Sequence, residues 1–194
     1  NKKVSMMGME ADHDWALHGP FLDKTLMRNY VAMNLAGELM DYAPDVRFCE
    51  VVINGEYRGV YVMMETVSTG KGRIEIEKPN KTRNVTGYIV ELDNDTQPDP
   101  LSEAKNFTKY TQILRKNAFF DIRYPKNEAL TLPLKDYIER DLSRFEKALY
   151  SFDYDTQRYG YKNFIDVDEF VDYFILMEVF VQHDTGNLST FFYK

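Results

Sequence analysis

Two strand-like runs rich in apolar residues, joined by Asn54-Gly55, form the clearest local pattern in the chain. Residues 46–53 and 56–65 are rich in aromatic and β-branched side chains, which are typical of strands. An Asn-Gly pair between two such runs indicates a two-residue type I′ turn, because both turn residues need a positive φ. We therefore predict an antiparallel hairpin in which Phe48 lies opposite Tyr61. Both faces carry large apolar groups, which favours a hairpin covered on both sides at its open end.

Three other stretches have the 3.6-residue spacing of amphipathic helices. The first spans residues 24–40 with Asp23 as its N-cap, the second starts near Thr131, and the third is capped by Asp166 or Asp168. Their expected apolar faces comprise Ala32, Leu35, Ala36 and Leu39 in the first, Leu134, Ile138, Leu142, Phe145 and Leu149 in the second, and Phe170, Phe174, Met177 and Val181 in the third.

The remaining apolar runs are short and predict further strands. These are residues 73–77, an exposed strand, then 87–93, one or two strands within 111–124, and 188–193. Residues 93–106 are polar and contain two prolines, so we expect a surface loop there. An irregular start, a helix, antiparallel strands and then helices are typical of an α+β fold and not of an alternating α/β fold.

The composition of the chain excludes several classes of function. A length of 194 residues predicts one domain. With 24 Lys and Arg against 31 Asp and Glu, the net charge of −7 excludes nucleic-acid binding through bulk charge. The single cysteine, Cys49, excludes an internal disulfide framework and cysteine-based metal centres. The most apolar run, residues 173–181, is far shorter than the roughly 20 residues of a transmembrane helix.

Arg28 lies at the N-terminal end of the first apolar helical face. An unpaired buried charge is costly, so this arginine needs a partner. The partner could be a carboxylate in a structural ion pair, which is the more common arrangement, or an anionic ligand.

A short polar segment, containing Asp184, Asn187 and Ser189, separates the last apolar helix from the last strand. Catalytic groups are often carried by such loops. A carboxylate followed closely by an amide or a hydroxyl could orient a substrate hydroxyl and hold a divalent metal. The spacing alone favours a simpler alternative, an Asx-turn at the helix end.

A second acidic group follows the strand at 87–93 and consists of Glu91, Asp93, Asp95 and Asp99. It could bind Ca²⁺, but it lacks the pattern of an EF-hand loop. A solvated acidic loop is therefore the favoured interpretation.

Four stretches together carry a family resemblance. They are DKTLMRN at 23–29, NGEYRGVY at 54–61, GYIVELD at 87–93 and LSTFFYK at 188–194. With Asp184 and the closing Glu65 of the hairpin, they resemble the spore coat protein H (CotH) kinase family over nearly the whole chain. The middle section and the LSTFFY ending are similar to the forms found in gut and rumen anaerobes.

The resemblance implies an atypical protein-kinase-like fold with an antiparallel N-lobe sheet and a mainly helical second lobe. Residues 1–194 would be a single kinase domain, truncated at both ends, with approximately 1–67 as the N-lobe-like part and 68–194 as the remainder. The resemblance implies a bacterial protein that lies outside the cell or at its surface. It also implies transfer of phosphate from ATP, with Mg or another divalent metal, to Ser or Thr of surface or coat proteins. The expected partner is thus a protein substrate, with no nucleic acid and no transmembrane segment.

The resemblance also assigns roles to individual residues. Asp184 falls at the family's catalytic aspartate, which accepts the proton of the substrate hydroxyl. Arg28 lies in the helix that would brace the ATP phosphates. The backbone groups around Glu65, Thr66 and Val67 would bind adenine, as the strand-to-hinge segment does in ordinary kinases.

The metal ligands depart from the kinase pattern. In the kinase catalytic loop the metal-binding Asn follows the Asp by five positions, and here that position is Ser189, whereas Asn187 comes earlier. Residues 1–14 show no match to the family's lysine-bearing strand, and its Trp-Asp-x-Asp motif would follow Lys194. We therefore expect these 194 residues alone to be inactive as a kinase, with ATP and metal bound in the full protein.

A non-catalytic adhesion or scaffold module that retains the fold is the alternative. It is supported by Ser189 and by the Tyr-rich segments 150–154 and 159–161, which could form a contact surface. A carbohydrate-binding module is a weaker alternative, because Trp15 is the only tryptophan.

Overall fold

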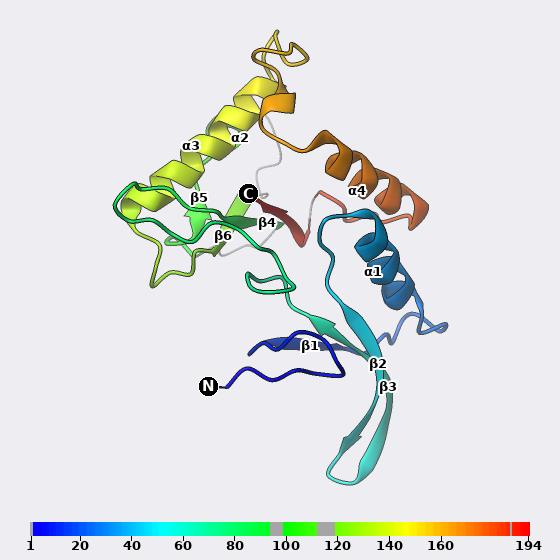
Figure 1. Ribbon diagram of the computed structural model, residues 1–194. Helices are drawn as coiled ribbons and strands as arrows, with labels where there is room; N and C mark the ends of the chain where they lie inside the picture. The colour runs from blue at the N-terminus through cyan, green and yellow to red at the C-terminus, as the bar shows by residue number, and fades with distance from the viewer. Residues whose placement is uncertain (1, 94–98, 112–118, 187) are drawn as a thin grey trace. The chain divides into compact units, whose positions relative to one another are not determined.

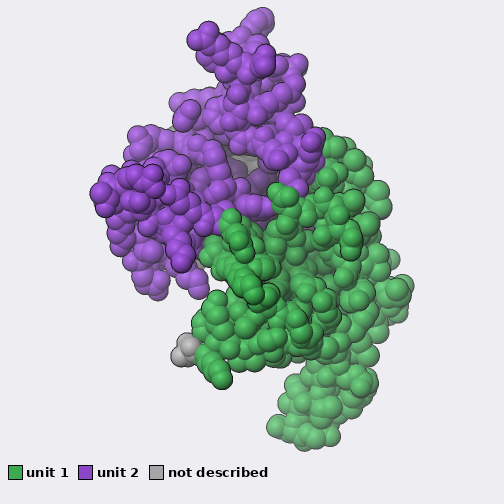
Figure 2. Space-filling view, viewed as in Figure 1, with its two compact units in different colours: residues 1–75, 171–181 green, residues 76–170, 182–194 purple. Residues whose placement is uncertain are grey.

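The computed structural model describes residues 2–93, 99–111, 119–186 and 188–194. The chain forms two compact units, shown in different colours in Figure 2. Unit 1 comprises residues 1–75 and 171–181, and unit 2 comprises 76–170 and 182–194. Both units contain helices and an antiparallel sheet, which confirms the predicted α+β class. The prediction of a single kinase domain that divides near residue 67 stays a prediction.

Unit 1 is built on a three-stranded antiparallel sheet of order β1-β3-β2 (Figure 1). Its elements are β1 (Trp15–His18), α1 (Arg28–Leu39), β2 (Val46–Ile53) and β3 (Glu56–Glu65). The strand β1 was not expected from the sequence, because its four residues have no partner nearby in the chain. It forms because β3 has a free edge, along which Trp15 pairs with Glu65 and His18 with Val62.

The predicted hairpin is confirmed, but its register is not. The turn residues Asn54 and Gly55 both have positive φ. A bulge between Val51 and Val52 leaves Arg58 without a partner in the ladder. As a result Phe48 lies opposite Val62, and the predicted Phe48–Tyr61 pair is wrong by one residue.

The first helix begins later than predicted. Leu26 has a φ of 61°, a left-handed conformation that interrupts a helix, so α1 starts at Arg28 instead of residue 24. Asp23 still caps the helix from a distance, because its carboxylate accepts the N–H of Arg28 at 2.9 Å. The helix packs on β2 through the ring of Tyr30, which stacks on Phe48 with centroids 4.3 Å apart. None of its residues is fully buried, so the predicted apolar face is only partly covered.

Unit 2 contains a four-stranded antiparallel sheet of order β5-β6-β4-β7. Its elements are β4 (Ile89–Asp93), β5 (Glu103–Ala104), α2 (Phe107–Thr111), β6 (Phe119–Tyr124), α3 (Leu132–Leu149), the 3-10 helix η1 (Tyr161–Asn163) and β7 (Thr190–Tyr193). The short strand β5 lies within the segment that the sequence predicted to be loop. Of the expected strands within 111–124, β6 is present and residues 112–118 lie outside the described residues.

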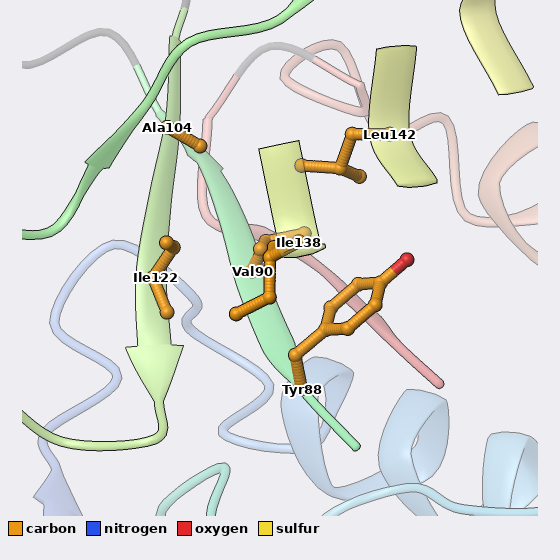
Figure 3. Packing of buried hydrophobic residues seen from close by; sticks show 6 residues of the cluster. All are labelled: Tyr88, Val90, Ala104, Ile122, Ile138 and Leu142. Carbon is orange, nitrogen blue, oxygen red and sulfur yellow. The ribbon is translucent and has the colours of Figure 1, made fainter. Parts of the chain in front are cut away.

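The core of unit 2 lies where α3 crosses one face of this sheet (Figure 3). Its buried side chains are Tyr88, Val90, Ala104, Ile122, Ile138 and Leu142. The predicted face of α3 is confirmed at its first three positions and fails at Leu149, which is exposed. Glu146 is buried instead, because its carboxylate accepts the N–H of Thr108 at 3.1 Å and the side-chain amide of Asn106.

The helix α4 (Val167–Val179) begins as predicted, since the carboxylate of Asp166 accepts the N–H of Asp168 at 3.1 Å. Its expected apolar stripe is not a core face, because Phe174 and Val181 are exposed and Leu176 is its one buried residue. None of the helices in the described parts of the chain is long and apolar enough to cross a membrane.

The predicted exposed strand at 73–77 is wrong. Arg73 and Ile74 are buried, and the segment is irregular apart from a single bridge between Thr69 and Ile74. The alternation of charged and apolar residues suggested a solvent-exposed strand, but the arginine forms ion pairs with Glu65 and with Asp12, which is far away in the sequence.

Candidate functional site

The segment that carries Asp184 follows α4 and leads into β7. It folds onto Thr190, a buried residue whose hydroxyl accepts the N–H of Gly186 at 3.0 Å and donates to the carbonyl of Leu188 at 3.2 Å. The N–H of Leu188 donates to the carbonyl of Asp184 at 3.0 Å. The backbone that follows Asp184 is thereby fixed within unit 2.

The Asp184 side chain is exposed, and no side chain or backbone group among the described residues binds its carboxylate. The Asx-turn alternative is therefore not seen within the described part of this loop. Ser189 is also exposed, with a φ of 47°. Asn187, the other predicted metal ligand, lies outside the described residues. An exposed carboxylate on a fixed backbone is suited to accept a proton from a hydroxyl.

Strand pairing brings one residue of the acidic group, Asp93, next to one residue of the polar segment, Ser189. Leu92 on β4 lies opposite Thr190 on β7 in an antiparallel pair, so Asp93 and Ser189 occupy adjacent positions at this end of the two strands. The sequence places these residues almost a hundred positions apart. Only the pairing of β4 with β7 makes them neighbours.

The other members of the acidic group have structural partners. Asp99 stabilises a turn, because its carboxylate accepts the N–H of Leu101 at 2.9 Å and the amide of Asn127 at 3.0 Å. Glu91 is buried and forms an ion pair with Arg123, and burial raises the pKa of Glu91 despite this cation. Asp95 lies outside the described residues. Within the described ranges no three His, Cys, Asp or Glu side chains are arranged to hold a metal ion.

Arg28 has the partner that the sequence required, although its own side chain is exposed. Its Nε lies 3.6 Å from the carboxylate of Asp23, and 80% of its side chain is accessible. The N–H of Arg28 and the hydroxyl of Thr25 hold the pKa of Asp23 below its usual value. The structural ion pair is present, and the guanidinium is still accessible to an anion.

The end of β3, where the resemblance places the adenine contacts, is buried at Glu65. The Glu65 carboxylate accepts the N–H of Asp45 at 3.2 Å and lies 3.7 Å from Arg73. Burial raises the pKa of Glu65. Thr66 and Val67 follow and are half-buried. The Glu65 N–H donates to the carbonyl of Asp45, and the Thr66 carbonyl accepts from Arg73. The backbone of this segment that is left for a nucleotide base is therefore mainly that of Val67.

Sequence reasoning missed Arg73, which organises this end of β3. The only local signal was its position next to Ile74 in an alternating run, and that pattern suggested an exposed strand. Asp12, its closest acidic partner, comes from the N-terminal segment that appeared irregular.

The residues fit a nucleotide better than a metal ion. Arg28 offers an accessible cation, and the residues after Glu65 offer backbone groups. For the metal, the described residues supply Ser189 but no set of three ligand side chains.

Comparison with known proteins places the chain in a family. The CotH kinase protein family matches residues 1–194, the whole chain. No curated protein and no solved structure matches it. The match over the full length agrees with the resemblance carried by the helix at Arg28, the hairpin and the segment from Asp184 to Lys194. The chain belongs to the CotH kinase family.

Proposed function

We propose that this protein is an ATP-dependent kinase that phosphorylates Ser or Thr residues of surface or coat proteins. The observation that carries the proposal is the exposed carboxylate of Asp184 on a backbone fixed by Thr190. Family membership supports a kinase-like protein that uses ATP and a divalent metal. We infer from the same resemblance that it works outside the cell or at the cell surface.

In this proposal Asp184 orients the substrate hydroxyl and accepts its proton as the oxygen attacks the γ-phosphate. Its accessibility supports this role, since no internal partner among the described residues competes for the carboxylate. Phosphoryl transfer depends mostly on positioning and on charge stabilisation, so a fixed backbone around the base matters. Asp93 on β4, which lies opposite Ser189 in the β4–β7 pair, is a second carboxylate at this end of the sheet.

The proposal assigns the nucleotide contacts to Arg28 and to the segment Glu65–Val67. The Arg28 guanidinium would pair with phosphate, and backbone groups of the segment Glu65–Val67 would bind the adenine edge. A divalent ion bound with ATP would neutralise charge on the phosphates. Asn187 and Ser189 are the residues of this chain that we propose as its ligands.

Transfer of labelled phosphate from ATP to a Ser/Thr-rich acceptor protein tests the proposal. The measurement should use the 194 residues and the full-length protein that contains them. We expect Asp184→Asn to reduce transfer by about 10²-fold or more, because loss of a general base costs about 10²–10⁴-fold. The matched control is Asp153→Asn, which removes an exposed carboxylate from the same unit. We expect the 194 residues alone to transfer no phosphate. Equal activity of the two full-length variants, or no ATP binding by the full-length parent protein, would refute the proposed function.

The segment between α3 and η1 favours a second candidate, a non-catalytic adhesion or scaffold module. Phe152 is fully exposed, and Tyr154 and Tyr159 are largely exposed. Backbone bonds hold this segment in shape, including Tyr161 N–H to the carbonyl of Tyr154 at 2.9 Å. Exposed aromatic residues on a structured loop are suited to protein contacts. Loss of cell-surface binding in Phe152→Ala, with no ATP binding by the parent protein, would favour this candidate over the kinase.

A further inference from the structure

The guanidinium of Arg73 is buried at the open end of the three-stranded sheet in unit 1. Only 2% of its side chain is accessible, and its Nε lies 3.2 Å from a carboxylate oxygen of Asp12 and 3.7 Å from one of Glu65. The ring of Trp15 lies against it, with the centroid 5.2 Å from the guanidinium carbon. The partners come from the N-terminal segment, β1 and β3, so one side chain connects three parts of the unit.

Arg73 also binds the backbone that leaves β3. Its Nη1 donates to the carbonyl of Thr66 at 2.7 Å and to the hydroxyl of Ser68 at 3.1 Å. Ser68 in turn donates to Asp12 at 3.2 Å. The loop closes on itself, since the N–H of Ile74 donates to the carbonyl of Ser68 at 3.3 Å. The conformation of residues 66–68 therefore depends directly on the position of this guanidinium.

Stability alone is a poor explanation for this arrangement. Within the described residues, Arg73 Nη2, the indole N–H of Trp15 and the hydroxyl of Tyr42 are buried without a hydrogen-bond partner. Each such group loses hydration without a compensating bond. Buried ion pairs are often no more stabilising than apolar side chains of the same volume. A better reason for an arginine at position 73 is the backbone conformation that its hydrogen bonds impose on residues 66–68.

We propose that Arg73 is a positioning residue for nucleotide binding, which holds the backbone of residues 66–68 in the conformation that receives the adenine base. This inference rests on the proposed function of the same segment. Lysine cannot replace arginine here, because a single ammonium group lacks the planar fork that reaches a carbonyl, a hydroxyl and two carboxylates together. Arg73 acts through the backbone it holds and does not itself contact the nucleotide.

Calorimetric titration of Arg73→Lys with ATP and, separately, with inorganic triphosphate tests the inference. Triphosphate lacks the base, so it reports on the phosphate contacts alone. We expect ATP to bind about tenfold more weakly, equivalent to about 1.4 kcal/mol, while triphosphate affinity is unchanged. Arg58→Lys is the matched control, because Arg58 is an exposed, ion-paired arginine of the same unit. It should alter neither affinity.

A purely structural role would weaken both ligands together or neither, and either result overturns the inference. Trp15 emission verifies that the variant keeps the packing around residue 73. If Arg73→Lys does not fold, Ser68→Ala can be used instead, because it removes one partner of the same guanidinium. This variant should weaken ATP binding by about threefold and leave triphosphate binding unchanged. An unchanged ratio of ATP affinity to triphosphate affinity would refute the inference. Failure of the parent protein to bind either ligand would instead refute the proposed function, and this inference with it.

Discussion

Replacing Gly59 by alanine tests the bulge that sets the register of the β2–β3 hairpin. Gly59 has a φ of 108°, which L-residues rarely adopt, and a Cβ placed there meets no atom within 4 Å. Steric crowding therefore contributes nothing, and the cost comes from the backbone alone. Left-handed backbone costs an L-residue about 1–2 kcal/mol. The bulge places Val62 opposite Phe48, and Val62 is fully buried, so the strand cannot relieve the strain by slipping one residue without exposing it.

The matched control is Gly37→Ala in α1. Gly37 has an ordinary helical backbone and open space around its Cβ, so alanine should stabilise unit 1 by about 0.4–1 kcal/mol. Both substitutions reduce the freedom of the unfolded chain equally. The difference in free energy of unfolding between the variants therefore isolates the strain at Gly59, and we expect Gly59→Ala to be less stable by about 1–2 kcal/mol. Urea unfolding followed by Trp15 fluorescence measures it. Equal stability of the two variants would refute the assigned bulge.

Three further predictions concern burial and protonation. Ile138→Ala should destabilise unit 2 by about 2–5 kcal/mol, because the Ile138 side chain is completely buried. Leu132→Ala on the same helix should cost less than about 0.5 kcal/mol, because Leu132 is 84% exposed. Equal shifts of the urea midpoint, followed by circular dichroism, would contradict this. Tyr88→Phe should lower the free energy of unfolding of unit 2 by about 1.5–3 kcal/mol, because it removes the 2.8 Å hydrogen bond to Asp141. The β7 amides should then exchange their hydrogens faster, and slower exchange in the variant would argue against this prediction. Burial raises the pKa of Glu65, so the native state holds its proton more tightly than the unfolded state, and stability falls as pH rises from its ordinary pKa of 4.5 through the native one. Glu65→Gln should flatten the stability profile as pH rises above about 4.5, and an unchanged slope would count against it.

Local sequence patterns predicted the structure correctly where the interacting residues are close together in the chain. The turn at Asn54-Gly55 needs only two residues that tolerate positive φ, and the buried face of α3 through Leu142 follows from helical spacing. The start of α4 could likewise be predicted from Asp166, whose side chain binds an amide two residues away. These interactions close within a few residues, so the sequence contains all of their participants.

Tertiary structure decided the features whose partners are distant in the chain. Glu146 replaces Leu149 on the buried side of α3 because Thr108 and Asn106 supply its hydrogen bonds. No periodicity predicts such a substitution, since the donors belong to another segment. The free energy of burying a charge depends on which groups surround it, and only the fold supplies that information.

The candidate site shows the same division. The family motifs, the hairpin and the place of Asp184 between a helix and a strand could all be predicted from the sequence. Only the pairing of β4 with β7 brought Asp93 beside Ser189, and only the packing around β3 buried Arg73 against Asp12 and Glu65. The physical reason is that hydrophobic periodicity reports which face of an element is covered, whereas strand pairing and buried ion pairs are set by residues that meet only after the chain has folded.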